Sequence, residues 1–314
     1  MRPQFFDLGH DVVCVDSGYQ RPGLAAIYLV VEGGRAAVID TGTANSLPYV
    51  VQSLEHRGIA PEAVAYVMPT HVHLDHAGGA GALVRAFRNA QLVLHPRGVR
   101  HMVDPSRLIE SATAVYGEAE FERLFGTLPP VAEDRILVAE DELVLDLNGR
   151  RLQILDTPGH ARHHYCVYDE RSRGLFTGDT FGLSYPEVEG GDAPFIFPTT
   201  TPVQFDPVAW GQTLDRFLTY PAKRMYLTHF GKLENVNRMS DDLRRRIEAH
   251  VEIAKAAGEA QNRENRILDD LRDYLVSELR RCGSATSPER ALSIYGMDLK
   301  LNAQGLGVWL DRSR

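Results

Sequence analysis

The stretch that decides the fold is Thr70-His71-Val72-His73-Leu74-Asp75-His76-Ala77-Gly78-Gly79. It places three imidazoles and one carboxylate within six residues, directly after the apolar run 63–68, which has the composition of a buried β-strand. Imidazole and carboxylate groups are metal ligands, and here they come where a strand ends and a helix begins. A polar loop that happens to be rich in histidine is the alternative interpretation, and the density of ligands argues against it. The stretch therefore predicts a metal site.

Four further candidate ligands stand in loops that each follow a predicted strand. Asp40 lies in Ile-Asp-Thr-Gly, His160 in Asp-Thr-Pro-Gly-His, Asp179 in Thr-Gly-Asp-Thr and His229 in Leu-Thr-His-Phe-Gly. Because every ligand comes directly after a strand, residues that are distant in sequence can converge on one edge of two packed sheets.

The rest of the chain reads as two blocks, in each of which strands are followed by helices. Glu32-Gly33-Gly34 and Asn148-Gly149 are typical of hairpin turns between strands. Asn45 is expected to cap a helix that runs to about residue 56. A helical insert over 103–125 is expected to cover one edge of the site, and the loop 181–207 is the candidate wall of a substrate pocket. Further strands are predicted over 12–15, 25–31, 36–40, 91–94, 136–138, 143–145, 152–155, 165–168, 175–177 and 224–227, and further helices over 81–90, 208–218, 239–257 and 259–281.

Composition limits the class of protein. The 314 residues are 44% hydrophobic, enough to bury a core, and no apolar run is long enough to span a bilayer. The N-terminus lacks the apolar segment of a signal peptide, so we expect a cytoplasmic protein. Three scattered cysteines are typical of reduced thiols in the core. A net charge of -8 argues against a nucleic-acid partner and favours a small-molecule substrate.

Taken together, these motifs resemble those of metallo-β-lactamase-fold proteins over roughly residues 10 to 234. The set H-x-H-x-D-H, followed at large spacings by His, Asp and His, is specific to the dinuclear branch that includes glyoxalase II, quorum-signal lactonases and ribonuclease Z. The resemblance implies an α/β fold, a four-layer αββα sandwich, over 1–234 and a helical C-terminal region over 235–314. A homodimer that uses these C-terminal helices is a further expectation.

The resemblance also implies a role for each ligand. One metal ion is expected on His71, His73 and His160, a second on Asp75, His76 and His229, and Asp179 is expected to bridge the two together with a hydroxide. Zinc is favoured, with iron or manganese as alternatives, since imidazole nitrogens bind such ions at about 2.0–2.1 Å. A carboxylate can span two ions that are about 3.5–4 Å apart.

Other residues have weaker support from the sequence. Asp40 matches a buried aspartate that orients a ligand loop in the family, although an Asp before Thr-Gly is also an ordinary turn residue. Arg162, His164 and Tyr185 are candidate substrate contacts. His164 matches a histidine found in the endoribonuclease branch, whereas Arg162 and Tyr185 have the alternative interpretations of a solvent-facing and a packed loop residue.

The function that the sequence predicts is that of a dinuclear metal-dependent hydrolase. A bridging hydroxide is expected to attack an ester-like carbonyl, in a thioester or a lactone, and the candidate catalytic residues are Asp75 and Asp179. Three alternatives remain open at this point. They are a phosphodiesterase or endoribonuclease of the same fold, a mononuclear iron persulfide dioxygenase, and a non-catalytic scaffold.

Overall fold

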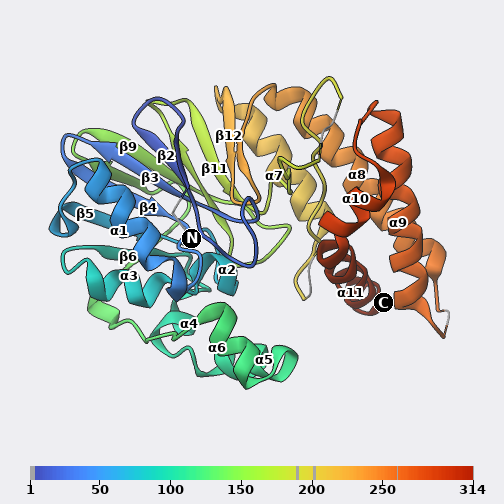
Figure 1. Ribbon diagram of the computed structural model, residues 1–314, viewed down its shortest axis with the longest axis horizontal. Helices are drawn as coiled ribbons and strands as arrows, with labels where there is room; N and C mark the ends of the chain where they lie inside the picture. The colour runs from blue at the N-terminus through green and yellow to red at the C-terminus, as the bar shows by residue number, and fades with distance from the viewer. Residues whose placement is uncertain (1–3, 189–190, 201–202, 260, 314) are drawn as a thin grey trace. The chain divides into compact units, whose positions relative to one another are not determined.

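The predicted strands form two β-sheets in the part of the chain that the computed structural model describes, which is residues 4–188, 191–200, 203–259 and 261–313 (Figure 1). The first sheet has the order β1-β2-β3-β4-β5-β6-β7, with β1 (Phe5–Asp7), β2 (Val12–Asp16), β3 (Ala26–Glu32), β4 (Arg35–Ile39), β5 (Val64–Met68), β6 (Gln91–Leu94) and β7 (Ile136–Val138). The second has the order β13-β12-β11-β10-β9-β8, with β8 (Val144–Leu147), β9 (Arg150–Asp156), β10 (Tyr165–Asp169), β11 (Gly174–Gly178), β12 (Arg224–Leu227) and β13 (Gly231–Leu233).

The first sheet changes from antiparallel to parallel at β4, and this change positions two of the candidate ligand loops. Strands β4 and β5 are parallel, with Ile39 opposite Met68. Their carboxyl ends therefore lie at the same edge, where Asp40 follows β4 and the segment Thr70 to His76 follows β5. The predicted turn between β3 and β4 is confirmed, since Gly33 and Gly34 both have positive φ angles, as a tight hairpin requires.

The second sheet uses alternate strands in the same way. Strand β10 pairs antiparallel with both β9 and β11, so β9 and β11 run in the same direction. His160 comes after the end of β9, and Asp179 comes directly after β11. The predicted hairpin at Asn148-Gly149 joins β8 to β9, and both of its residues have positive φ angles.

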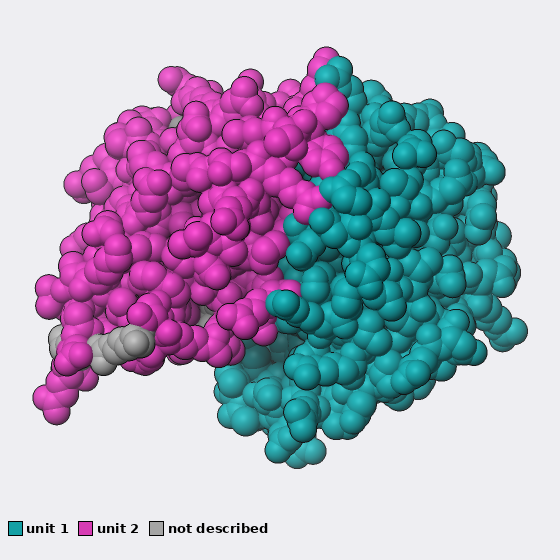
Figure 2. Space-filling model, turned by 180° about the vertical axis from the view of Figure 1, so that it is seen from behind, with its two compact units in different colours: residues 1–156, 163–178, 228–232 teal, residues 157–162, 179–227, 233–314 magenta. Residues whose placement is uncertain are grey.

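The chain divides into two compact units, shown in Figure 2. Unit 1 comprises 1–156, 163–178 and 228–232, and unit 2 comprises 157–162, 179–227 and 233–314. In unit 1, helices α1 and α3 lie against the first sheet, and the core between them is built from aliphatic residues such as Val38, Leu54 and Leu83 (Figure 1). The helices of this unit are α1 (Leu47–His56), α2 (Leu74–Ala77), α3 (Ala80–Ala86), α4 (Val99–Val103), α5 (Ser106–Tyr116) and α6 (Glu118–Phe125).

Unit 2 contains the long loop and the C-terminal helices. Its helices are α7 (Pro207–Thr219), α8 (Val236–Ala257), α9 (Arg263–Arg281), α10 (Pro288–Ile294) and α11 (Gly296–Arg312). The α/β class, the αββα sandwich and the C-terminal helical extension are thus confirmed. The proposed domain boundary at residues 234 and 235 stays a prediction. Within the described ranges, no helix is long and apolar enough to cross a membrane.

One local expectation was wrong. Asn45 does not cap α1, because it lies inside a short 3-10 helix, Ala44–Ser46, and its side-chain amide donates to the carbonyl of Arg123. The segment from Pro288 onward forms a further pair of helices, which the sequence pattern did not predict individually. Helix α11 contains Gly305 and Gly307, which lower helix propensity and hid it from the sequence pattern. Of the loop 181–207, residues 189–190 and 201–202 lie outside the described residues, as do residues 1–3 of the stretch examined for a signal peptide.

Candidate metal centre

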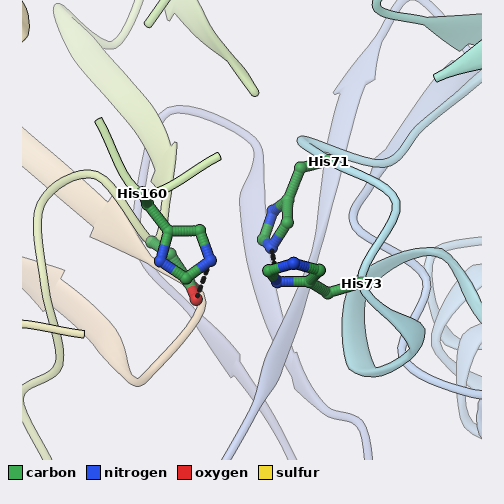
Figure 3. A group of neighbouring side chains, drawn as sticks. His71, His73 and His160 are labelled. Atoms are coloured by element: carbon green, nitrogen blue, oxygen red, sulfur yellow. Dashed lines mark hydrogen bonds and ion pairs between the residues drawn. The ribbon is translucent and has the colours of Figure 1, made fainter. Parts of the chain in front are cut away.

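Two groups of side chains bring possible metal-ligand atoms close together. Within each group these atoms all lie within 4.8 Å of one another, and the groups are His71, His73, His160 and Asp179, and Asp75, His76 and His229. The seven residues are those that the sequence singled out as metal ligands. Figure 3 shows the imidazoles of His71, His73 and His160.

The histidine motif folds into a short extended segment followed by helix α2. His73 has extended backbone angles and immediately precedes Leu74, the first residue of the helix. The Nε2 atom of His71 and the Nδ1 atom of His73 lie 2.8 Å apart, and the two rings meet edge to face (Figure 3). A Cβ on Gly79 would lie 2.5 Å from the carbonyl oxygen of Thr41. Only glycine therefore allows the chain after the motif to approach the Asp40 loop this closely.

Asp40 supports the histidine motif through hydrogen bonds to its carboxylate. Its Oδ1 atom accepts hydrogen bonds from the backbone N–H of Thr70, at 2.7 Å, and from the Thr70 hydroxyl, at 2.9 Å. Its Oδ2 atom lies 3.0 Å from Nδ1 of His76 and accepts a further hydrogen bond from the hydroxyl of Thr228. A carboxylate accepts at this position, so His76 donates from Nδ1, and in the neutral ring the lone pair is then on Nε2, where a metal could bind. Asp40 therefore orients a candidate ligand and joins the two Thr-His sequences.

Backbone carbonyls orient two further histidines in the same way. The Nδ1 atom of His229 lies 2.7 Å from the carbonyl oxygen of Leu24, and the Nδ1 atom of His160 lies 2.9 Å from that of Thr199. A carbonyl cannot donate, so each ring carries a proton on Nδ1, and in the neutral ring the lone pair is then on Nε2. Such hydrogen bonds to the second nitrogen are the usual support of metal-ligating histidines.

The two carboxylates of the set lie beside these Nε2 atoms. Asp75 places Oδ2 3.4 Å from Nε2 of His229 and 3.7 Å from Nε2 of His76. Asp179 places Oδ2 3.3 Å from Nε2 of His160. Each group thus combines imidazole nitrogens with a carboxylate, a donor set that suits zinc and other divalent first-row metals.

The charge of Asp75 also affects two phenols. Burial, together with the nearby Asp75 carboxylate, raises the pKa of Tyr19 above its ordinary value, and the same two causes raise the pKa of Tyr116. Tyr19 packs in an apolar cluster with residues of the helical insert, and Leu24, Leu74, Ile109 and Tyr116 are half-buried against that cluster. The predicted insert therefore presents an apolar surface to the neighbourhood of Asp75.

The three predicted substrate contacts have different environments. The hydroxyl of Tyr185 donates to Oδ1 of Asp298 at 3.1 Å, within unit 2. Arg162 is exposed and its backbone N–H donates to the side chain of Gln204. His164 is buried and its ring stacks on His71 with a centroid distance of 4.9 Å. Their roles as substrate contacts stay predictions.

Sequence reasoning missed the threonines that share Asp40. Thr70 and Thr228 each precede a candidate ligand, and both hydroxyls donate to the same carboxylate. The dipeptide Thr-His after both β5 and β12 was the signal available in the sequence. No comparable side-chain signal existed for Leu24 and Thr199, because both act through backbone carbonyls.

Comparisons with known proteins concern the family and the fold. Residues 21–229 match the family model of the metallo-beta-lactamase superfamily. A metallo-beta-lactamase fold-containing protein, ST1585, of Sulfurisphaera tokodaii is 27% identical over 249 residues, which are 76% of this chain and 86% of that protein. The human acyl-coenzyme A thioesterase MBLAC2 is 28% identical over 173 residues, which are 51% of this chain and 60% of the thioesterase.

A solved structure supports the fold over nearly the whole length. The metallo-beta-lactamase family protein TTHA1429 of Thermus thermophilus superposes with a TM-score of 0.67 at 20% identity, covering 98% of this chain and 95% of that one. At this identity the match concerns the fold alone. It extends beyond the sheets into the C-terminal helices.

Proposed function

Since the chain belongs to the metallo-beta-lactamase superfamily, we propose that it is a hydrolase that uses two divalent metal ions. One ion would be held by His71, His73 and His160, and the other by Asp75, His76 and His229. Asp179 would be shared by the two ions. The chain has thioesterase relatives and candidate metal groups, and these support a metal-dependent hydrolase.

The observation that carries this proposal is the fixed orientation of the imidazoles. His76, His160 and His229 each donate Nδ1–H to an oxygen acceptor, which is Asp40 in one case and a backbone carbonyl in the other two. In the neutral form of each ring, Nε2 is therefore the nitrogen that carries the lone pair. A structural role in a core would not require three histidines to have the same tautomer beside carboxylates.

When bound, such ions would lower the pKa of a coordinated water to near neutrality and would act as Lewis acids toward a carbonyl group. Residues of the chain would transfer the proton and hold the ions. Asp75 lies 3.4 Å from His229 and is less buried than Asp179, so it is the carboxylate better placed to pass a proton to a leaving group. Asp179 is only 4% exposed and would act as a ligand.

The surroundings favour an uncharged acyl group in the substrate. The half-buried residues Leu74, Ile109 and Tyr116 pack on the apolar cluster that contains Tyr19, and Leu74 is the neighbour of Asp75 in the sequence, which suits the acyl part of a thioester or a lactone. The net charge of -8 disfavours a polyanion such as RNA. The thioesterase relative supports the same substrate class. Zinc as the native metal, the cytoplasmic location and a homodimer stay predictions.

The proposal is tested with a substrate panel on metal-loaded protein. We expect hydrolysis of short thioesters or lactones, its loss on chelation, and its return when Zn²⁺, Fe²⁺ or Mn²⁺ is restored. Preferred cleavage of bis-p-nitrophenyl phosphate would replace the proposal with a phosphodiesterase. Oxygen uptake with a persulfide and one iron per chain would replace it with a dioxygenase.

A further inference from the structure

The last helix of the chain contains a buried asparagine that is bonded to the long loop. Asn302 of α11 has an exposed fraction of 0%. Its Nδ2 atom donates to the carbonyl of Pro198 at 2.9 Å, and its Oδ1 atom accepts from the backbone N–H of Thr200 at 2.7 Å. The Thr200 hydroxyl also donates to the backbone carbonyl of Asn302 at 3.2 Å. These three hydrogen bonds fix the chain on both sides of Thr199.

The residue between these two anchor points is the one that orients His160. The carbonyl of Thr199 accepts the Nδ1 proton of His160 at 2.9 Å. Thr199, Thr200 and His160 are all at least 96% buried, so water is poorly placed to replace a lost partner. The position of this one carbonyl therefore decides which nitrogen of His160 is protonated and where Nε2 points.

We propose that Asn302 is a positioning residue for the candidate metal ligand His160, and that α11 is thereby a functional part of the metal centre. This inference rests on the proposed function only in requiring that His160 binds a metal. The chain of contacts runs from the Asn302 amide to the Pro198–Thr200 segment, then to the Thr199 carbonyl, and then to the imidazole. All of these residues belong to unit 2.

The requirement for asparagine follows from its two kinds of hydrogen-bonding atom. A carboxamide offers a donor and an acceptor on one planar group, which matches a carbonyl on one side and an N–H on the other. In Asn302→Asp the shape is kept, but a carboxylate oxygen would face the carbonyl of Pro198 and repel it. We therefore expect the segment to shift and the Nδ1 proton of His160 to lose its acceptor.

The test compares Asn302→Asp with Gln304→Glu in the full-length protein. Gln304 is exposed on the same helix, so its variant makes the same change of charge without touching the loop. Co²⁺ is titrated into each metal-free protein in competition with a chelator, and the absorption bands of the bound ion are followed. We expect one of the two metal equivalents to bind about 10- to 100-fold more weakly in Asn302→Asp, and both to bind normally in Gln304→Glu.

The second metal group provides an internal reference, because His229 is oriented by Leu24 in unit 1. A merely structural role for Asn302 would lower the unfolding midpoint of the metal-free protein without weakening one site selectively. If Asn302→Asp does not fold, Thr200→Val serves instead, since it removes only the hydroxyl that bonds to Asn302. It should weaken the same equivalent about 3- to 10-fold, since it removes one of three bonds.

The two proposals fail in different ways. Wild-type protein that binds no metal would refute the proposed function. Wild-type protein that binds two equivalents, with a folded Asn302→Asp or Thr200→Val variant of unchanged affinity at both, would refute only the role of Asn302.

Discussion

Replacing Asp40 with asparagine tests how the centre is supported. The side chain is 1% exposed and its backbone has a φ of 55°, a conformation that asparagine tolerates well, so the variant changes little besides the charge. The carboxylate accepts from Thr70 on one edge and from His76 and Thr228 on the other. A carboxamide has only one acceptor oxygen, so one of these edges must bring a donor against a donor.

The structure indicates how large the effect should be. If the amide oxygen keeps Thr70, the amide N–H groups face Nδ1 of His76 and force its proton onto Nε2, which then cannot bind a metal. We expect the metal equivalent on His76 to bind about 10- to 100-fold more weakly. One buried donor that loses its partner should also lower the free energy of unfolding of the metal-free protein by about 1–3 kcal/mol.

The assay is chelator competition for metal affinity, together with urea unfolding of the metal-free protein. Asp11→Asn is the matched control, because Asp11 also has a positive φ but is exposed, and its contact to Arg171 lies at the surface. Surface ion pairs contribute about 0–1 kcal/mol to the free energy of unfolding, so this control should be nearly as stable as the wild type. Because its contact lies at the surface, it should also bind both metals normally. Wild-type affinity for both equivalents in Asp40→Asn would refute the reasoning that Asp40 fixes the tautomer of His76.

Two further predictions concern stability. Burial, with a smaller contribution from the Arg246 charge, lowers the pKa of His250 to about 4, although its hydrogen bond to the Arg246 carbonyl opposes this shift. Between pH 6.5 and 4 only the unfolded chain takes up this proton, so stability present at neutral pH is lost as the pH falls, by roughly 3 kcal/mol. In urea unfolding of the metal-free protein, the free energy of unfolding of His250→Gln should fall less than that of the wild type as the pH is lowered. An equal fall in both proteins would contradict this prediction. Asp206 caps α7 by accepting hydrogen bonds from the N–H groups of Val208 and Ala209. In the same assay, Asp206→Ala should lower the free energy of unfolding by about 1 kcal/mol. An unchanged free energy of unfolding would show that the cap does not stabilise the protein.

The local part of the candidate centre could be proposed from the sequence. The spacing of His71, His73 and His76 is fixed by one short turn into a helix, so the pattern itself shows that the side chains are neighbours. His160 and Asp179 could be placed because each follows a strand, and alternate strands of an antiparallel sheet end at one edge.

The supporting contacts could not be predicted from the sequence, for physical reasons. Thr199 and Leu24 hold histidines through backbone carbonyls, which every residue has, so no side-chain pattern marks them. Asn302 meets Thr200 across 102 positions of sequence, and it lies on a helix whose glycines conceal the helical pattern. Such contacts depend on tertiary packing and leave no local periodicity.

The central claim, that the chain holds two metal ions on the residues named, is tested most directly by the metal content of purified protein and of His71→Ala. We expect two divalent ions per wild-type chain, about one in His71→Ala, and no hydrolysis of thioesters or lactones by the variant. Two ions per chain in His71→Ala, with hydrolysis unchanged, would contradict this claim.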